Sequence, residues 1–189
     1  MAKIFLSLLL FAVVAAAQKF GFGAGVKGGY PFTGLFVANN VAGNPVTTLS
    51  SSNNYLVGPA MELRIPFGFA IEVDGLYRGT RYDLNSANGT TAAINSASWE
   101  IPYLAKFRFP IPVLKPFVEG GGSYRTFTNL PTNITPSHNA FVLGGGLELK
   151  ISHLRLSGEA RWQRWGQPAT NLLVQLGQNQ GEVLFGIMF

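Results

Sequence analysis

The sequence predicts an all-β fold: a closed, antiparallel, eight-stranded up-and-down transmembrane β-barrel. Eight segments alternate apolar and polar side chains with a period of two, as strands with two unlike faces do. Long polar connections and short turns follow these segments in alternation. Most of the charged residues fall on one of the two faces, so the faces differ sharply in chemistry.

The composition separates this chain from an ordinary soluble domain. Of its 189 residues, 47% are hydrophobic and only 12% are charged, whereas a soluble domain carries about 25% charged residues. The net charge is +5, and the chain has no cysteine, which excludes a disulfide framework and thiolate chemistry. The length fits a single domain.

The first residues have the layout of a secretory signal peptide. Lys3 precedes an apolar run over residues 4–14, and alanines at 15–17 supply the small residues of a cleavage site. An uncleaved anchor helix is the alternative, but the run is shorter than the roughly 20 residues that cross a bilayer. We therefore expect a signal peptide at residues 1–17 and a barrel domain at residues 18–189.

In each of the first four segments, apolar or aromatic side chains alternate with charged residues or glycines. The first sets Phe20, Phe22 and Val26 against glycines and Lys27. The second and third are joined by a Pro-Phe-Gly sequence that favours a tight turn. The expected strands are residues 20–30, 55–65, 69–78 and 98–109.

The last four segments repeat this alternation. The fifth lies within the glycine-rich stretch KPFVEGGGSYR, and a turn at residues 151–153 joins the sixth to the seventh. The eighth places Val183, Phe185 and Ile187 on one face and ends on Phe189. The expected strands are residues 118–125, 141–150, 154–162 and 180–189.

The connections predict the topology. Segments rich in Asn, Thr, Ser and Gly follow the first, third, fifth and seventh strands, and short turns follow the others. A transmembrane barrel has this pattern, with long extracellular loops, short periplasmic turns and both termini in the periplasm. It excludes a parallel sheet, which needs long crossovers. Pro59 and Pro102 fall inside expected strands, where a missing donor predicts bulges or local register changes.

The charges indicate which face points inward. Eight of the nine acids and nine bases share the polar face, which is therefore nearly neutral. An enclosed interior requires such balance, because an unpaired buried charge is strongly destabilising. The predicted interior network comprises Lys27, Glu62, Arg64, Glu72, Asp74, Arg78, Glu100, Lys106, Arg108, Glu119, Arg125, Glu148, Lys150, Arg155, Glu159, Arg161 and Glu182.

The apolar face carries aromatic residues at both ends of the strands. Such paired girdles mark the two interfaces of a transmembrane barrel with its membrane. A soluble barrel with the same alternation is the alternative, but it would expose this band to water. The residues are Tyr30, Tyr55, Tyr77, Trp99, Tyr124 and Trp162 near the loops, and Phe20, Phe69, Phe109 and Phe189 near the turns.

Three stretches carry a resemblance to a known family. The final residues EVLFGIMF end on Phe189 and resemble the assembly signal of Gram-negative outer-membrane proteins. FGFGAGVKGGY at the start and KPFVEGGGSYR in the fifth strand resemble the small eight-stranded barrels of the OmpA, OmpX and opacity-protein kind. The resemblance covers the whole mature chain. It implies the outer membrane of a Gram-negative-type bacterium and recognition of Phe189 by the outer-membrane assembly machinery.

Function is expected in the loops, since many proteins share the scaffold while loops vary. We predict a structural or surface-interaction, adhesin-like role toward a host or environmental surface ligand. The longest loop, about residues 31–54, contains apolar residues at 35–37 that either extend the strands or form a contact site. Arg81 and Arg164 fall near the extracellular rim, where they pair with lipopolysaccharide phosphates or act as ordinary interfacial anchors.

Two alternative functions stay open. A narrow pore for small solutes and ions requires the interior ion pairs to rearrange, whereas the favoured interpretation has them plug the lumen. A lipid A-modifying enzyme requires a nucleophile and a base that converge. Ser137-His138 and Ser152-His153 are each neighbours in sequence, and neighbouring side chains on a strand point apart.

The preferred interpretation therefore has no catalytic residues, no metal site and no cofactor. Its expected partners are outer-membrane lipid, with lipopolysaccharide as a candidate, and the assembly machinery. Nucleic acid is not expected despite the basic composition, because most of the bases are assigned to the barrel interior. The chain is expected to be a monomer.

Overall fold

A computed structural model describes residues 20–33, 36–38, 46–86, 91–128, 137–166 and 174–189. The predicted signal peptide, residues 1–17, lies outside them. Within the described ranges, no helix combines the length and the apolar character needed to cross a membrane.

The described chain consists of strands and one short 3-10 turn. They are β1 (Gly21–Pro31), β2 (Phe36–Ala38), β3 (Val46–Arg64), η1 (Pro66–Gly68), β4 (Phe69–Asp74), β5 (Leu76–Ser86), β6 (Thr91–Arg108), β7 (Leu114–Thr128), β8 (Asn139–Ile151), β9 (Leu154–Trp165), β10 (Val174–Leu176) and β11 (Asn179–Met188). β4 and β5 follow one another along the same path and are interrupted at Gly75, so together they count as one barrel strand. β2 and β10 pair with each other in a separate two-stranded sheet.

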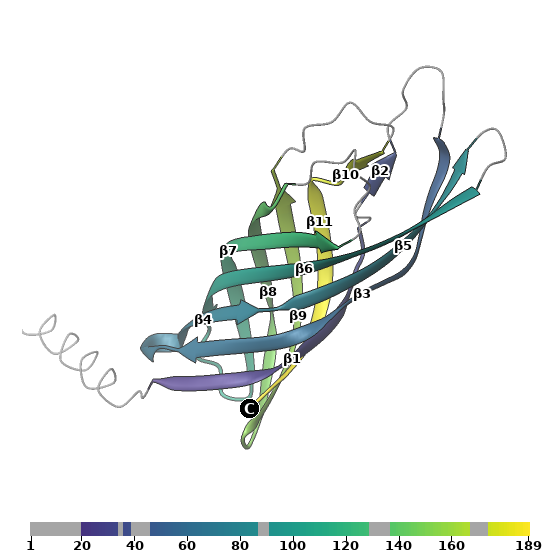
Figure 1. The fold of residues 1–189 in the computed structure, drawn as a ribbon. Helices are drawn as coiled ribbons and strands as arrows, with labels where there is room; N and C mark the ends of the chain where they lie inside the picture. The colour runs from purple at the N-terminus through teal and green to yellow at the C-terminus, as the bar shows by residue number, and fades with distance from the viewer. Residues whose placement is uncertain (1–19, 34–35, 39–45, 87–90, 129–136, 167–173) are drawn as a thin grey trace, which may run out of the picture.

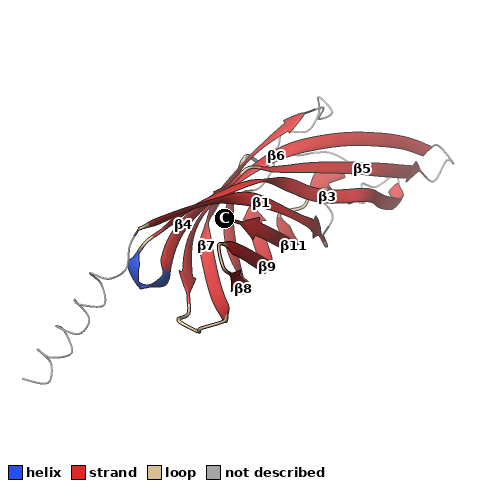
Figure 2. Cartoon of the chain, turned by 90° about the horizontal axis from the view of Figure 1, so that it is seen from below, coloured by secondary structure: helices blue, strands red, loops and turns tan. Residues whose placement is uncertain are grey.

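The main sheet closes on itself as an antiparallel barrel (Figures 1 and 2). β1 closes it because β1 pairs with both β11 and β3, placing Val26 opposite Ile187 on one side and Pro59 on the other. The backbone N–H of Phe189 donates to the carbonyl oxygen of Ala24 over 3.0 Å and ties the C-terminus to this seam. The predicted closed barrel of eight antiparallel strands is confirmed.

The two faces of the barrel wall differ as the alternation requires. Large apolar side chains point outward, and Phe22 and Phe185 expose 65% and 68% of their surface. Most of the charged side chains that the structure describes point inward and are buried. We call the end with η1, the β6–β7 and β8–β9 turns and Phe189 the turn end, and the opposite end the loop end. Outward aromatic rings contact one another at both ends: Tyr77 with Trp99 at the loop end, and Phe69 with Phe107 at the turn end.

The two prolines face the gap between β4 and β5 from either side. The N–H of Gly75 donates to the carbonyl oxygen of Pro59 over 2.9 Å, but Pro59 has no N–H to return. Pro102 lies in the part of β6 that spans the same gap. Both β3 and β6 keep one register across this gap. The predicted register change at the prolines is therefore wrong. Strand pairing is interrupted at the gap and continues beyond it in the same register.

Three strands extend far beyond the loop ends that the alternation predicted. β3 begins at Val46, β5 runs to Ser86 and β6 begins at Thr91, and these outer parts pair with one another beyond the barrel wall (upper right of Figure 1). Their sequences are rich in Ser, Thr and Asn, so they lack the apolar row that marked the other strands. Residues 36–38 of the first long loop pair with β10, not with a barrel strand.

Gly58 offers a test of this wall. A methyl group at position 58 would collide with the carbonyl oxygen of Gly75, whereas one at Gly28 would lie 3.6 Å from the nearest atom, the carbonyl oxygen of Leu56. We expect Gly58→Ala to lower the free energy of unfolding by about 1–3 kcal/mol, the usual cost of overpacking. Urea titration in detergent micelles measures this. Gly28→Ala is the control, and an equal loss in both variants would contradict the assignment.

Candidate functional site

The barrel interior holds its charged side chains in three groups along the axis. The mouth cluster lies at the turn end and comprises Glu62, Arg64, Arg108, Glu148 and Arg155. The central cluster comprises Lys27, Glu72, Asp74, Lys106, Glu119, Glu159 and Arg161. The loop-end cluster comprises Arg78, Glu100, Arg125, Trp165, Gln180 and Glu182.

Arg161 organises the central cluster. Its guanidinium lies 2.9 Å from Glu72, 2.8 Å from Asp74 and 2.7 Å from Glu119. Alternation places these groups together, because Glu72 and Asp74 are two residues apart on β4, as Glu159 and Arg161 are on β9. The guanidinium also lies 2.8 Å from Glu159, so the arginine contacts carboxylates on β4, β7 and its own strand β9.

Two lysines complete the central cluster from other strands. Lys27 on β1 lies 2.5 Å from Glu72 and 2.7 Å from Glu159. Lys106 on β6 lies 2.7 Å from Glu72 and 3.2 Å from Glu119. Four carboxylates and three cations therefore neutralise one another almost completely in a region closed to water. Removing one partner leaves an uncompensated buried charge.

Three of these carboxylates lie close enough together to hold a cation. Their oxygens, from Glu72, Asp74 and Glu159, are within 4.8 Å of one another. Lys27 and Arg161 already contact all three carboxylates. The geometry is that of an ion-pair network in which amino and guanidinium groups occupy the place of a metal.

Three buried leucines pack together on one side of the lumen. They are Leu56 of β3, Leu76 of β5 and Leu184 of β11, and each is 0–1% exposed. Elsewhere the central and loop-end clusters meet directly, because Glu182 lies opposite Arg161 in the β9–β11 ladder. The leucines therefore add apolar bulk to one side of a lumen that is otherwise lined by polar side chains.

The loop-end cluster combines ion pairs with aromatic contacts. Arg78 lies 3.2 Å from Glu100 and donates a hydrogen bond of 2.8 Å to Gln180. The guanidinium of Arg125 lies 3.7 Å from the ring centroid of Trp165, whose indole N–H donates to Gln180 over 3.1 Å. These bulky side chains fill the lumen below the loops.

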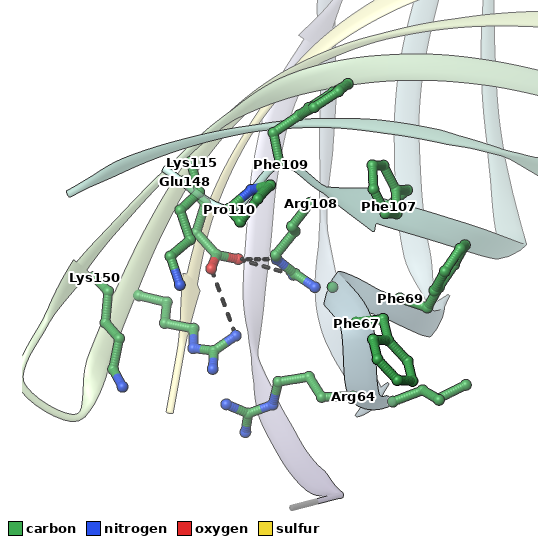
Figure 3. Close-up of a pocket in the computed structure, with 13 residues that line it drawn as sticks. Arg64, Phe67, Phe69, Phe107, Arg108, Phe109, Pro110, Lys115, Glu148 and Lys150 are labelled. Carbon is green, nitrogen blue, oxygen red and sulfur yellow. Dashed lines mark hydrogen bonds and ion pairs between the residues drawn. The ribbon is translucent and has the colours of Figure 1, made fainter. Parts of the chain in front are cut away.

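The mouth cluster borders an open cavity of about 970 Å³ at the turn end (Figure 3). Arg108 pairs with Glu62 and, over 2.8 Å, with Glu148. Arg155 lies 3.5 Å from both of these carboxylates. Unlike the deeper clusters, this one is partly accessible: the side chains of Arg64 and Arg155 are 25% and 14% exposed.

Comparison with known proteins supports the fold. No known protein family and no curated protein matches the sequence. Among solved structures, the outer membrane protein OprG from Pseudomonas aeruginosa matches with a TM-score of 0.60 and 12% identity, over 90% of this chain and 95% of OprG. Neisserial surface protein A (NspA) matches with a TM-score of 0.58 and 16% identity, over 90% of this chain and 98% of NspA. This chain has the fold of the small outer-membrane barrels.

The structure places the predicted interior residues as follows. Arg64 and Arg155 are partly exposed, Lys150 is exposed, and the others are buried. The assignment of Lys150 to the barrel interior is wrong because it lies one residue from the end of β8, where the wall gives way to the turn. The buried residues are Lys27, Glu62, Glu72, Asp74, Arg78, Glu100, Lys106, Arg108, Glu119, Arg125, Glu148, Glu159, Arg161 and Glu182.

Sequence reasoning missed two inward-facing residues. Gln163 is buried in the lumen, and Lys115 lines the mouth cavity. Alternation counted from Arg161 or Glu119 would have found both, because each lies an even number of residues away on the same strand. Attention to charge alone hid Gln163, and Lys115 was passed over because the fifth strand was expected to begin only at residue 118. Gln180, which alternation places on the polar face of the last strand, is buried.

The two serine–histidine pairs lie at opposite ends of the barrel and have different surroundings. His138 lies at the loop end, where its Nδ1–H donates a hydrogen bond of 2.7 Å to the carbonyl oxygen of Arg125 and its ring stacks on Tyr124. Ser137 instead contacts the backbone oxygen of Asn139 over 3.4 Å. Ser152 and His153 form the exposed β8–β9 turn at the other end. Among the contacts described for these four residues, none joins a serine hydroxyl to a histidine ring.

Three further predictions concern residues at the edges of the barrel. Arg164 is exposed near the loop end of β9, and the side chain of Arg81 lies outside the described residues. Their pairing with lipopolysaccharide stays a prediction. Phe189 is 69% exposed at the turn end, and its recognition by an assembly machinery also stays a prediction.

Lys106 and Lys150 form a matched pair for testing the interior network, since one is buried among three carboxylates and the other is exposed. We expect Lys106→Met to lower the free energy of unfolding by about 3–5 kcal/mol, because it leaves buried carboxylates without their cationic partner. Lys150→Met should change it by less than about 0.5 kcal/mol. Urea titration followed by tryptophan fluorescence measures both. Similar losses in the two variants would contradict a central network.

Proposed function

We propose that this protein is an integral outer-membrane barrel of a Gram-negative-type envelope, with a plugged lumen and a surface-interaction role carried at its loop end. The observation that carries the role is the projection, which we define as residues 46–54 of β3, 80–86 of β5 and 91–96 of β6. The membrane location is supported by the outward apolar face, which lipid solvates and water does not.

The projection continues beyond the point where the neighbouring strands end. Pairing of β1 with β3 stops at Gly29 and Leu56, and pairing of β6 with β7 stops at Ala97 and Thr128. Above these pairs the three strands pair with one another, as Figure 1 shows. Sheet edges that carry unused backbone donors and acceptors bind extended segments of other chains. The projection is therefore the part of the molecule best suited to bind a surface ligand.

The interior supports a structural scaffold better than a pore. Conduction through this lumen would require the central ion pairs, among them those of Lys27 and Arg161, to separate. Each separated ion would lose its partners in a region with little water to replace them. The fold is also shared with OprG and NspA, but at this identity the likeness concerns the fold alone.

Trimming the projection tests the proposed role. Thr80 and Ser96 lie opposite each other, so replacing residues 81–95 with Asn-Gly closes the hairpin with a favoured two-residue turn. We expect attachment of expressing cells to polystyrene and to cultured epithelial cells to fall to the level of cells without the protein. The barrel itself should still fold, because the strand pairs below Thr80 remain.

A smaller replacement provides the control. Exchanging only residues 87–90 for Asn-Gly leaves the β5–β6 pairs through Asn85 and Thr91 in place and should preserve attachment. Gel mobility with and without boiling, together with surface labelling, checks that both variants are folded and equally abundant. Unchanged attachment of the trimmed variant to both surfaces would refute the proposed role.

A further inference from the structure

We infer that the cavity at the turn end binds an anionic phospholipid of the periplasmic leaflet. The phosphate lies against the basic residues of the mouth, and the acyl chains cross the rim onto the outward phenylalanines. This inference rests on the proposed location in the outer membrane, which brings the turn end to the level of the inner-leaflet headgroups. It adds a ligand and a site at the end opposite the projection.

The cavity carries a surplus of positive charge. Arg64, Arg108, Lys115, Lys150 and Arg155 line it, against Glu148 and the adjoining Glu62. Five cations face two carboxylates, so the mouth carries a net surplus of three positive charges. The deeper clusters carry no such surplus, because their acids match or outnumber their bases.

The unmatched cations are also the accessible ones. Arg108 and Arg155 share the two carboxylates, whereas Lys115 and Lys150 have no ion-pair partner in the part of the chain that the structure describes. Arg64 is held at the rim by a hydrogen bond to the carbonyl oxygen of Phe22, and its Nε lies 3.7 Å from Glu62 without a hydrogen bond. Figure 3 shows Lys150 and Arg64 at opposite sides of the opening. A phosphate between them would meet several donors.

The other side of the cavity is apolar and continues onto the lipid-facing wall. Phe69, Phe107 and Phe109 line it, and their rings contact one another at 5.0 and 5.3 Å between centroids. Phe67 adds a fourth ring from η1, held at a φ of 68°, which a bulky residue rarely adopts. Phe69 and Phe109 are 51% and 42% exposed on the outer face. A soluble anion would use only the basic side, whereas an anionic lipid uses both.

Native mass spectrometry of the full chain, refolded in detergent micelles, tests this inference. The probes are dioleoylphosphatidylglycerol, dioleoylphosphatidylcholine and glycerol 1-phosphate. We expect the phosphatidylglycerol to bind about tenfold more tightly than the phosphatidylcholine, a difference of about 1.4 kcal/mol. Lys115→Gln with Lys150→Gln should abolish this preference, because these lysines supply the unpaired charge without supporting the interior network.

Lys115→Arg with Lys150→Arg is the matched control, since it changes the same two positions but keeps both positive charges at the mouth and should leave the preference intact. Equal binding of the two lipids, equal loss in both double variants, or competition by glycerol 1-phosphate as strong as by the lipid would overturn the inference. Gel mobility before and after boiling, with flotation of reconstituted vesicles, reports folding and insertion separately. A chain that inserts but shows no lipid preference refutes this site alone, whereas a chain that fails to insert refutes the proposed function.

Discussion

The barrel depends on buried charges that satisfy one another at its centre. Arg161 contacts carboxylates on β4, β7 and its own strand β9, while Lys27 and Lys106 add β1 and β6 to the same network. Because little water reaches these groups, each ion needs its partners in place at once. The network therefore joins strands that are far apart in the sequence. Backbone ladders hold neighbouring strands together, and the central cluster links strands across the lumen.

Burying the charges inside leaves the apolar side chains outside. An outer wall of exposed Phe, Tyr, Leu and Val side chains is unfavourable in water and suited to lipid. The same constraint separates the two ends of the molecule. At the loop end, polar strands outgrow the barrel and form the projection; at the turn end, the interior network gives way to a mouth with unpaired bases. The projection and the mouth both lie where the network of buried ion pairs ends.

Much of this arrangement could be predicted from the sequence because a strand has a period of two. Once Glu72 and Asp74 were assigned inward, alternation placed Ile71 and Val73 outward, and the structure has them so. The polar extensions of β3, β5 and β6 could not be predicted in the same way, since Ser, Thr and Asn on both faces leave no alternation to follow. The pairing of β2 with β10 joins two loops distant in sequence and has no local signal.

The structural effect of the two prolines can be seen only when three neighbouring strands are considered together. Pro59 and Pro102 looked like separate irregularities, but both lie beside the gap at Gly75, which is visible only when the strands are placed next to one another. The error at Lys150 has a similar origin. Alternation gives the side of the wall but not the point at which the wall ends, and at a turn an inward position already faces water.

Neighbouring residues on one strand of this barrel face its outer apolar surface and its interior in turn. Val142 and Leu143 on β8 are 0% and 47% exposed, and the chain has no cysteine, so single thiols can be placed at either position. The most direct measurement is thiol accessibility in reconstituted vesicles, using a lipid-soluble and a water-soluble maleimide. Leu143→Cys should react with the lipid-soluble reagent alone, and Val142→Cys with neither until the protein is denatured. Rapid reaction of either variant with the water-soluble reagent in the folded protein would contradict the account.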